Sequence, residues 1–316
     1  MAHDHRIKGI DCEGAAAVGV HKALNERFEE MSRLRRDAVK WKDPEGVHSM
    51  RVASRRLRSA LSDFMPHVNK RSLSSILKQI RSIADALGEV RDQDVAILAL
   101  EKLESETPPE FFPTLQKLID ARKEIRRTSR QELKRILVKD RMKELGDDFD
   151  KALTAATRLK GGMLTSSPYS HSYKDVAKAI IRDRLVELET LSTSLYQPFE
   201  AAQLHEMRIG AKRLRYAVEM FASCWDSDIV LFAKSCARLQ GALGRLHDCD
   251  VWIQSFRQEI QESEKMGLRE RTEAFAWLFT HFNDLRHSHF QESFSLWKTW
   301  EADQLSEKLR EALKSN

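Results

Sequence analysis

The sequence predicts an all-α protein built from two related helical halves. Its 316 residues include only 12 glycines and 7 prolines, about half of what average usage would give. Few turn formers in a long chain indicate long helices and short connections, and no stretch alternates apolar and polar residues as a strand would. The strongest observation is a repeat, because one amphipathic helical segment occurs twice in the chain.

The repeated segment is rich in arginine and carries a histidine near its start. It reads VHSMRVASRRLRSALSDF from Val47 to Phe64 and LHEMRIGAKRLRYAVEMF from Leu204 to Phe221, 157 positions later. At about 100° per residue, each copy separates an apolar face from a stripe of cations about 15 Å long. The stripe residues are His48, Arg51, Arg55 and Arg58 in the first copy and His205, Arg208, Lys212 and Arg215 in the second. A solvated basic face would explain one such helix, whereas its repetition with the histidine favours a function.

A second repeated element follows each copy at nearly the same offset. LGEVRDQDV begins at Leu87 and LGRLHDCDV begins at Leu243. Two aspartates at i and i+2 cannot share a helix face, so we do not expect a metal pair. We expect at least one aspartate of each pair to hold a guanidinium of the repeated helix. Because both elements repeat in the same order, the duplicated unit is predicted to be half of the protein.

The other helices follow from apolar periodicity and from breaks at proline and glycine. Asp43 and Pro44 predict the start of the first repeated helix, and Pro66 predicts its end. The predicted helices are 14–39, 47–64, 72–100, 115–137, 142–159, 173–194, 204–221, 229–252 and 267–313. The predicted organisation is a flexible tail over 1–13, a first half over 14–159, a linker over 160–173 and a second half over 174–316.

Composition and charge restrict the class of protein. A net charge of +5 favours an anionic partner. The four cysteines form no CxxC pair, and we expect them to be the reduced thiols of a cytoplasmic protein. The N-terminus has no apolar segment of the secretory type, and no run of 18 apolar residues would span a membrane.

The stripes predict a polyanionic ligand. Like-charged neighbours at i+3 or i+4 each cost a few tenths of a kcal/mol, and a polyanion would offset that cost. Arginine forms bidentate hydrogen bonds with phosphate oxygens, and histidine can gain a charge near neutral pH. Because each stripe is longer than one phosphate group, it suits a chain of charges. Two stripes related by pseudo-symmetry would line the walls of one groove.

Other chemistries have motifs that this sequence lacks. It contains no GxxxxGKS or GxxxxGKT phosphate loop and no GxGxxG motif. A phosphohistidine mechanism at His48 or His205 would need an acidic partner and a single site, whereas the histidine is duplicated. We therefore expect no enzymatic activity, no metal and no cofactor. Two alternatives stay open: a nucleic-acid-binding helical module, which shares salt-dependent phosphate contacts, and a phosphohydrolase or metal-binding protein.

The two repeated elements together resemble the CHAD family, named for a conserved histidine α-helical domain. The likeness extends from Ala15 to Leu313. It implies two pseudo-symmetric antiparallel helical bundles that form one compact unit around a basic channel. It also implies that the channel binds inorganic polyphosphate and that the protein associates with polyphosphate granules. Family members often carry a triphosphate tunnel domain that starts with ExExK. We do not find that motif, so we expect a stand-alone binding module.

The resemblance assigns the binding residues by motif. They are the eight stripe residues, with Lys78, Lys234 and Arg91 as further candidates. The second copy departs from the first at Lys212, which replaces an arginine, and at His247, which stands where the first copy has Arg91. Both can carry a positive charge, although a neutral His247 would contribute little to phosphate binding. Inorganic polyphosphate is the expected partner, and nucleic acid is the second candidate.

Overall fold

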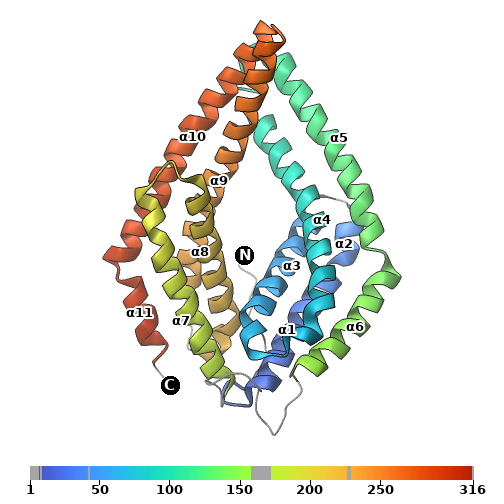
Figure 1. Ribbon diagram of the computed structural model, residues 1–316, viewed down its shortest axis with the longest axis vertical. Coiled ribbons are helices and arrows are strands. Elements are labelled where there is room, and N and C mark those ends of the chain that lie inside the picture. The colour runs from blue at the N-terminus through green and yellow to red at the C-terminus, as the bar shows by residue number, and fades with distance from the viewer. Residues whose placement is uncertain (1–6, 8, 42, 158–171, 226–228, 315–316) are drawn as a thin grey trace. The chain divides into compact units, whose positions relative to one another are not determined.

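Every regular element in the described part of the chain is a helix, which confirms the predicted all-α class. The computed structural model (Figure 1) describes residues 7, 9–41, 43–157, 172–225 and 229–314. The predicted linker, 160–173, lies outside the described residues except for its last two positions. Residues 1–6 and 8 of the predicted tail also lie outside them.

The chain forms two compact units, and each contains one copy of the repeated helix. Unit 1 comprises Met1–Ser105 and Lys117–Ala179, and unit 2 comprises Glu106–Gln116 and Ile180–Asn316. The sequence-based halves, 14–159 and 174–316, remain predictions.

Unit 1 is built around a ring of four packed helices. Its elements are α1 (Ala16–Arg33), α2 (Arg35–Lys40), α3 (Glu45–Phe64), the 3₁₀ turn η1 (Met65–His67), α4 (Lys70–Lys102), most of α5 (Phe112–Ile136) and α6 (Lys139–Thr157). Helix α1 packs on α3, α3 on α4, α4 on α6, and α6 on α1 (Figure 1). The ring encloses the core of the unit.

The repeated helix α3 enters this core with its apolar face. Its buried apolar residues are Val47, Met50, Ala53, Leu57, Ala60, Leu61 and Phe64. Each large side chain among them contributes about 1.5–3 kcal/mol by leaving water. The helix begins one residue later than Asp43 as N-cap and Pro44 as first helical residue predict: Pro44 is the N-cap, and the Asp43 carboxylate accepts a hydrogen bond from the backbone N–H of Glu45 at 2.9 Å. The face opposite the core is thereby held toward solvent.

The predicted helix over 14–39 is two helices. Helix α1 ends at Arg33, α2 begins at Arg35, and Trp41 closes α2 in a left-handed conformation with φ 47°. The end of α2 lies against the first turn of α3, where a Cβ at Gly46 would sit 2.5 Å from the Asp37 carbonyl oxygen. Only glycine permits this approach. The break lacks a glycine or proline of its own, so apolar periodicity did not reveal it.

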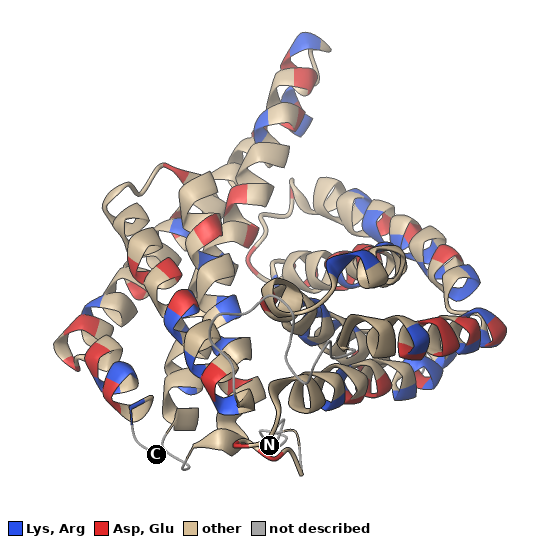
Figure 2. Cartoon of the chain, turned by 60° about the horizontal axis from the view of Figure 1, so that its bottom comes forward, with Lys and Arg blue, Asp and Glu red and all other residues tan. Residues whose placement is uncertain are grey.

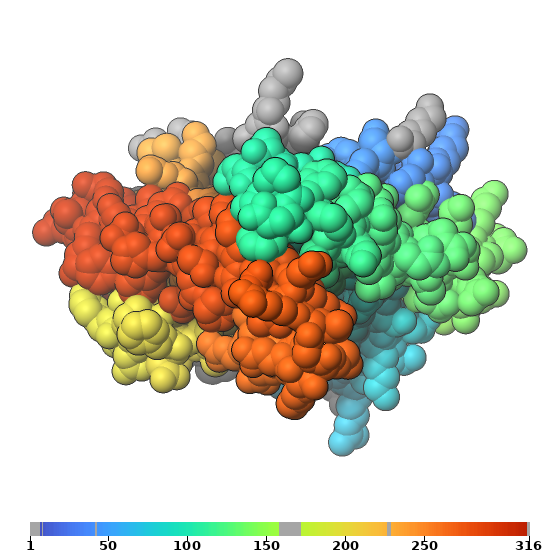
Figure 3. Space-filling view, turned by 90° about the horizontal axis from the view of Figure 1, so that it is seen from above, coloured from blue at the N-terminus to red at the C-terminus, as the bar shows by residue number. Residues whose placement is uncertain are grey.

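Unit 2 contains a long helical hairpin with shorter helices packed on it. Its elements are α7 (Tyr173–Leu191) from Ile180 onward, η2 (Ser192–Tyr196), α8 (Ala201–Phe221), η3 (Ala222–Cys224), α9 (Ile229–Lys265), α10 (Arg269–Ala302) and α11 (Leu305–Ala312). Helix α8 packs on α9, α9 on α10, and α11 on both hairpin helices. Viewed from the hairpin's connecting end, α9 and α10 lie in contact (Figure 3).

Aromatic side chains fill the interface between α9 and α10. Trp252 stacks on Phe256 with ring centroids 5.2 Å apart, and Phe282 lies 5.6 Å from Phe256. Such contacts add about 0.5–1.5 kcal/mol per pair beyond area burial. The predicted single segment 267–313 is divided at Gln304, which adopts a left-handed φ of 52° between α10 and α11.

The expectation of four reduced thiols is wrong for two cysteines. Cys12 and Cys224 are disulfide-bonded, and cysteine spacing alone cannot reveal such bonds. Cys236 and Cys249 are free and buried. Burial raises the pKa of the Cys249 thiol to about 12, so it stays protonated and unreactive at neutral pH. Within the described chain, we find no helix of the length and apolarity that crossing a membrane requires.

Candidate functional site

The cations of α3 lie on the face opposite the core. His48, Arg51 and Arg55 are half-buried, and Arg58 is exposed, whereas Leu57 is fully buried. The separation into an apolar and a cationic face is therefore present in the folded helix. The half-buried position of three of these groups limits their hydration, which strengthens their interaction with an anion.

Carboxylates of α4 contact two of the α3 arginines. Arg51 donates a hydrogen bond to Asp92 at 3.1 Å, as we expected of the Asp-x-Asp element. Arg58 lies 3.7 Å from Asp85. Arg55, between the two arginines, makes no hydrogen bond or ion pair with any residue that the structure describes. Its charge is therefore available to a ligand.

The glycine of each Leu-Gly element lies beside the first arginine of the repeated helix. A Cβ built on Gly88 would lie 4.0 Å from Arg51 Nε, and one on Gly244 would lie 3.6 Å from Arg208 Nε. In both units, therefore, a guanidinium packs against the equivalent glycine of the neighbouring helix. This equivalence supports the predicted duplication and shows how the two repeated elements act together.

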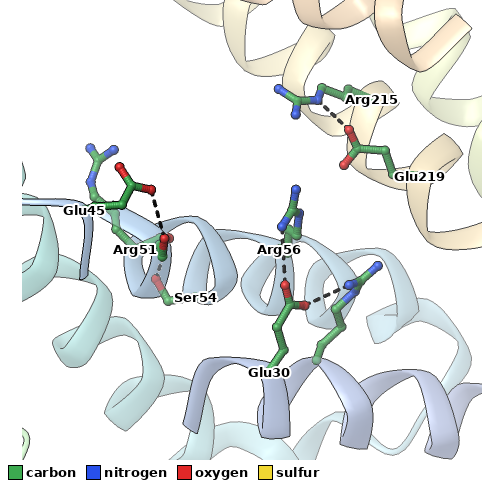
Figure 4. Close-up of polar contacts among 9 residues, drawn as sticks. Glu30, Glu45, Arg51, Ser54, Arg56, Arg215 and Glu219 are labelled. Carbon is green, nitrogen blue, oxygen red and sulfur yellow. Dashed lines mark hydrogen bonds and ion pairs between the residues drawn. The ribbon is translucent and has the colours of Figure 1, made fainter. Parts of the chain in front are cut away.

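In unit 2, the corresponding cations lie on α8. His205, Arg208, Lys212 and Arg215 are all half-buried. Arg215 donates to Glu219 on the same helix at 2.7 Å (Figure 4). Arg215 also donates to Gln240 of the neighbouring helix α9 at 3.4 Å, where Arg58 has Asp85 of α4.

The two stripe histidines have equivalent neighbours, except that His247 in unit 2 replaces Arg91 of unit 1. The His205 ring lies against the His247 ring, with centroids 4.1 Å apart, and Arg91 is the matching electrostatic neighbour of His48. The Nδ1 atoms of His48 and His205 are buried, and neither has a hydrogen-bond partner among the described residues. Both rings are half-buried, so a ligand would reach each imidazole at its accessible edge and not at Nδ1.

Burial and neighbouring cations keep both imidazoles neutral. The pKa of His48 is lowered by burial and then by Arg91, and Glu45 opposes this shift. The pKa of His205 is lowered by burial and then by His247 and Arg208. A bound anion would reverse the electrostatic part of these shifts, because it favours the charged imidazolium.

The three further candidates on α4 and α9 differ in exposure and in their distance from the stripe. Arg91 is half-buried beside His48, so it joins the stripe of unit 1. Lys78 is exposed and precedes Asp85, the partner of Arg58, by seven residues, or about 10 Å along α4. It therefore flanks the end of the stripe. Lys234 is also exposed and occupies the matching position on α9.

The second aspartate of each Asp-x-Asp element contacts the following helix. Asp94 accepts from Arg126 of α5 at 3.2 Å, and Asp250 accepts from Arg286 of α10 at 2.6 Å. In unit 1 the two aspartates thus hold arginines on two different helices. The sequence could not identify Arg126 or Arg286 as partners, because both lie outside the repeated elements.

Two matched ion-pair triads join each stripe helix to the helix that contains the triad's glutamate. The sequence did not lead us to predict them. Glu30 of α1 pairs with Arg27 at 2.8 Å and with Arg56 at 3.4 Å (Figure 4). The triad of unit 2 comprises Glu187 of α7, Arg184 and Arg213. Each member lies 157 positions after its counterpart, so extending the repeat alignment upstream would have found them.

The charges of both units are locally mixed. Basic and acidic residues alternate along the helices in Figure 2, so a cationic surface depends on which side chains share a helix face. No group of three or more histidine, cysteine, aspartate or glutamate residues that could hold a metal ion occurs in the described part of the chain.

Comparison with known proteins identifies a family and a fold. The model of the CHAD domain matches residues 22–257. The crystal structure of the CHAD domain from the plant Ricinus communis superposes with a TM-score of 0.66 at 22% identity, covering 90% of this chain and 94% of that one. PptA from Streptomyces chartreusis superposes with a TM-score of 0.63 at 15% identity, covering 90% and 100%. At these identities the two structures show the fold.

Among curated sequences, the chain is similar to an uncharacterized protein of Mycobacterium tuberculosis. The two are 27% identical over 202 residues, which is 62% of this chain and 38% of the relative. The chain therefore spans well under half the length of the curated relative that it matches.

Proposed function

The chain belongs to the CHAD domain family, and from this membership and its two matched cationic stripes we propose that it binds inorganic polyphosphate without hydrolysing it. One observation carries the proposal: both units anchor the same histidine-and-arginine face by equivalent means. Arg51 and Arg208 each lie beside the glycine of a Leu-Gly element. Each stripe helix also forms an ion pair with a glutamate of a preceding helix.

The chemistry of the stripes suits a linear chain of phosphates. Guanidinium groups form paired hydrogen bonds with phosphate oxygens, and successive stripe cations are spaced by about one helical turn over about 15 Å. Arg55 brings a charge that no described carboxylate neutralises. Nucleic acid would satisfy the same charges, but base recognition needs amide or exposed aromatic side chains on the binding face. The stripe positions carry only histidine, arginine and lysine.

The surroundings of the histidines support binding rather than phosphoryl transfer. A nucleophilic histidine is normally oriented by an acidic partner. Nδ1 of His48 and of His205 has no hydrogen-bond partner among the described residues. We therefore propose that the histidines contribute hydrogen bonds and ligand-induced charge. Release of phosphate from polyphosphate in the presence of Mg²⁺ or Mn²⁺ would contradict this part of the proposal.

Charge reversal at both stripes tests the binding proposal. The double variant Arg51→Glu with Arg208→Glu should bind long-chain polyphosphate about 100-fold more weakly or worse. Each substitution removes a charge-assisted hydrogen bond of about 1.5–3 kcal/mol and adds repulsion. Binding is measured by calorimetric titration at several salt concentrations, and circular dichroism verifies that the variant is folded.

The matched control changes the same charge outside the stripes. Arg33 and Arg269 are exposed, with side chains 65% and 88% accessible, and each pairs with a glutamate one turn away on its own helix. Arg33→Glu with Arg269→Glu should bind like the parent. Equal binding by the stripe variant and the parent would refute the assignment of the stripes. Displacement of polyphosphate by DNA or RNA at equal phosphate concentration would favour the nucleic-acid alternative.

A further inference from the structure

Unit 1 carries a second group of cations, on α5, that the repeat does not include. Arg126 and Arg130 are one helical turn apart and therefore share a face of α5. Arg126 pairs with Asp94 of α4 at 3.2 Å. Asp94 is almost fully buried, with a side chain only 3% accessible. Arg126 thus pairs with a carboxylate that has little access to water.

The guanidinium of Arg130 stacks on the ring of Trp41. Its guanidinium carbon lies 3.6 Å from the Trp41 ring centroid, which is the geometry of a close cation–π contact. Trp41 is fixed at the end of α2, where its backbone N–H donates to the Asp37 carbonyl. Arg130 Nε is buried and has no hydrogen-bond partner among the residues that the structure describes. The tryptophan therefore holds a guanidinium whose polar groups are incompletely satisfied.

The charges around Asp94 do not balance. Arg126, Arg91 and Arg130 all act electrostatically on this one carboxylate, so the group has an excess of about two positive charges. Burial, and next the repulsion from Arg126, lowers the pKa of Arg130. Partly buried cations without counter-charges destabilise a fold. An anionic ligand would offset that cost.

Arg91 connects this group to the stripe of α3. It acts on Asp94 and also on His48, the first stripe residue. Arg91 therefore lies within electrostatic range of both the α3 stripe and the α5 cations. Unit 2 differs, because Arg286 donates both to Asp250 and to the Pro198 carbonyl. Its guanidinium is engaged internally.

We propose that Arg91, Arg126 and Arg130, with Trp41 as the platform for Arg130, extend the polyphosphate-binding face of unit 1 onto α5. This inference rests on the proposed function and adds a contact region that the repeated motif does not contain. A chain that occupies the α3 stripe continues past Arg91 and places a phosphate group on the guanidinium of Arg130. The binding faces of the two units are consequently unequal.

Salt dependence of affinity counts the phosphate contacts and therefore tests the extension. The logarithm of the association constant falls with the logarithm of salt concentration in proportion to the number of phosphates neutralised, by roughly 0.7–0.9 per contact for nucleic acids. Arg130→Gln should weaken binding of long-chain polyphosphate and reduce this slope by about that amount. The control is Arg127→Gln on the same helix, since Arg127 is 64% accessible and pairs with Glu124. The control should keep the parental slope.

A conservative variant separates ligand contact from a structural role. Arg130→Lys retains the charge but loses the planar stack on Trp41, so it should keep the parental slope with an intermediate affinity. If Arg130 only fixes α5 to α2, the glutamine and lysine variants should weaken binding equally and both slopes should match that of Arg127→Gln. That result, with parental binding intact, overturns the extension alone. Failure of the parent protein to bind polyphosphate overturns this inference and the proposed function together.

Discussion

At the scale of single residues, protonation links the histidines to the ligand. His48 and His205 have pKa values below the ordinary value for histidine, first because of burial and next because of Arg91 and His247, respectively. The folded protein therefore binds fewer protons at these sites than the unfolded chain. Their contribution to stability is present above pH 6.5 and declines as the pH falls through the folded-state values. Ligand binding acts in the opposite direction, because phosphate oxygens favour the imidazolium.

We expect the affinity for polyphosphate to rise as the pH falls from 8 toward 6. The bound state takes up protons between the lowered pKa values of the free histidines and their higher values in the complex. Calorimetry in buffers of different ionisation enthalpy measures this uptake. The double variant His48→Gln with His205→Gln should remove most of it, whereas His287→Gln, at an exposed position of α10, should not. An affinity that does not change with pH would contradict a direct role for the stripe histidines.

At the scale of elements, the stripe helices depend on glutamates of the preceding helices. In unit 1 the arginines bonded to Glu30 are nearly inaccessible, with side chains 6% and 7% exposed. In unit 2 the arginines bonded to Glu187 are 21% and 39% exposed. Because water compensates a broken pair only where it can reach the charges, the two triads should contribute unequally to stability.

Neutralising the two glutamates should therefore have different costs. Glu30→Gln should lower the free energy of unfolding by about 2–3 kcal/mol, since it removes the negative charge that two buried guanidiniums share. Glu187→Gln should cost about 1 kcal/mol. Urea denaturation measures both. Glu29→Gln serves as the control, because Glu29 is half-exposed and its partner Arg33 is more so; it should change stability by less than about 0.5 kcal/mol. Equal losses for all three variants would contradict the assigned role of Glu30.

The sequence was informative where a pattern repeats and uninformative where a contact joins unlike elements. The apolar and cationic faces of α3 and α8 follow from helical periodicity, and the Arg51–Asp92 pair follows from the coupling of two repeated motifs. The break at Leu34 leaves no comparable signal, because no proline or glycine marks it. The Arg130–Trp41 contact joins two helices whose packing no local spacing reveals. Periodicity predicts which face of a helix is buried, but not which neighbour covers the rest.

At the scale of the whole molecule, the chain carries the same cationic stripe in both units, but different residues flank the two stripes. Unit 1 adds Arg91 and the α5 cations to its stripe, whereas unit 2 places His247 against His205. The charge of the unit 2 face therefore depends more on pH. A polyphosphate chain long enough to engage both faces would bind more tightly than to either face alone, through the high effective concentration of the second site.

The most direct measurement is a crystal structure of the protein with a short polyphosphate. We expect phosphate groups within hydrogen-bond distance of Arg51 and Arg55 on α3 and of Arg208 and Lys212 on α8. We also expect ligand oxygens close to the accessible edges of the His48 and His205 imidazoles. A structure in which polyphosphate binds elsewhere, with both stripes occupied only by water, would contradict the central claim.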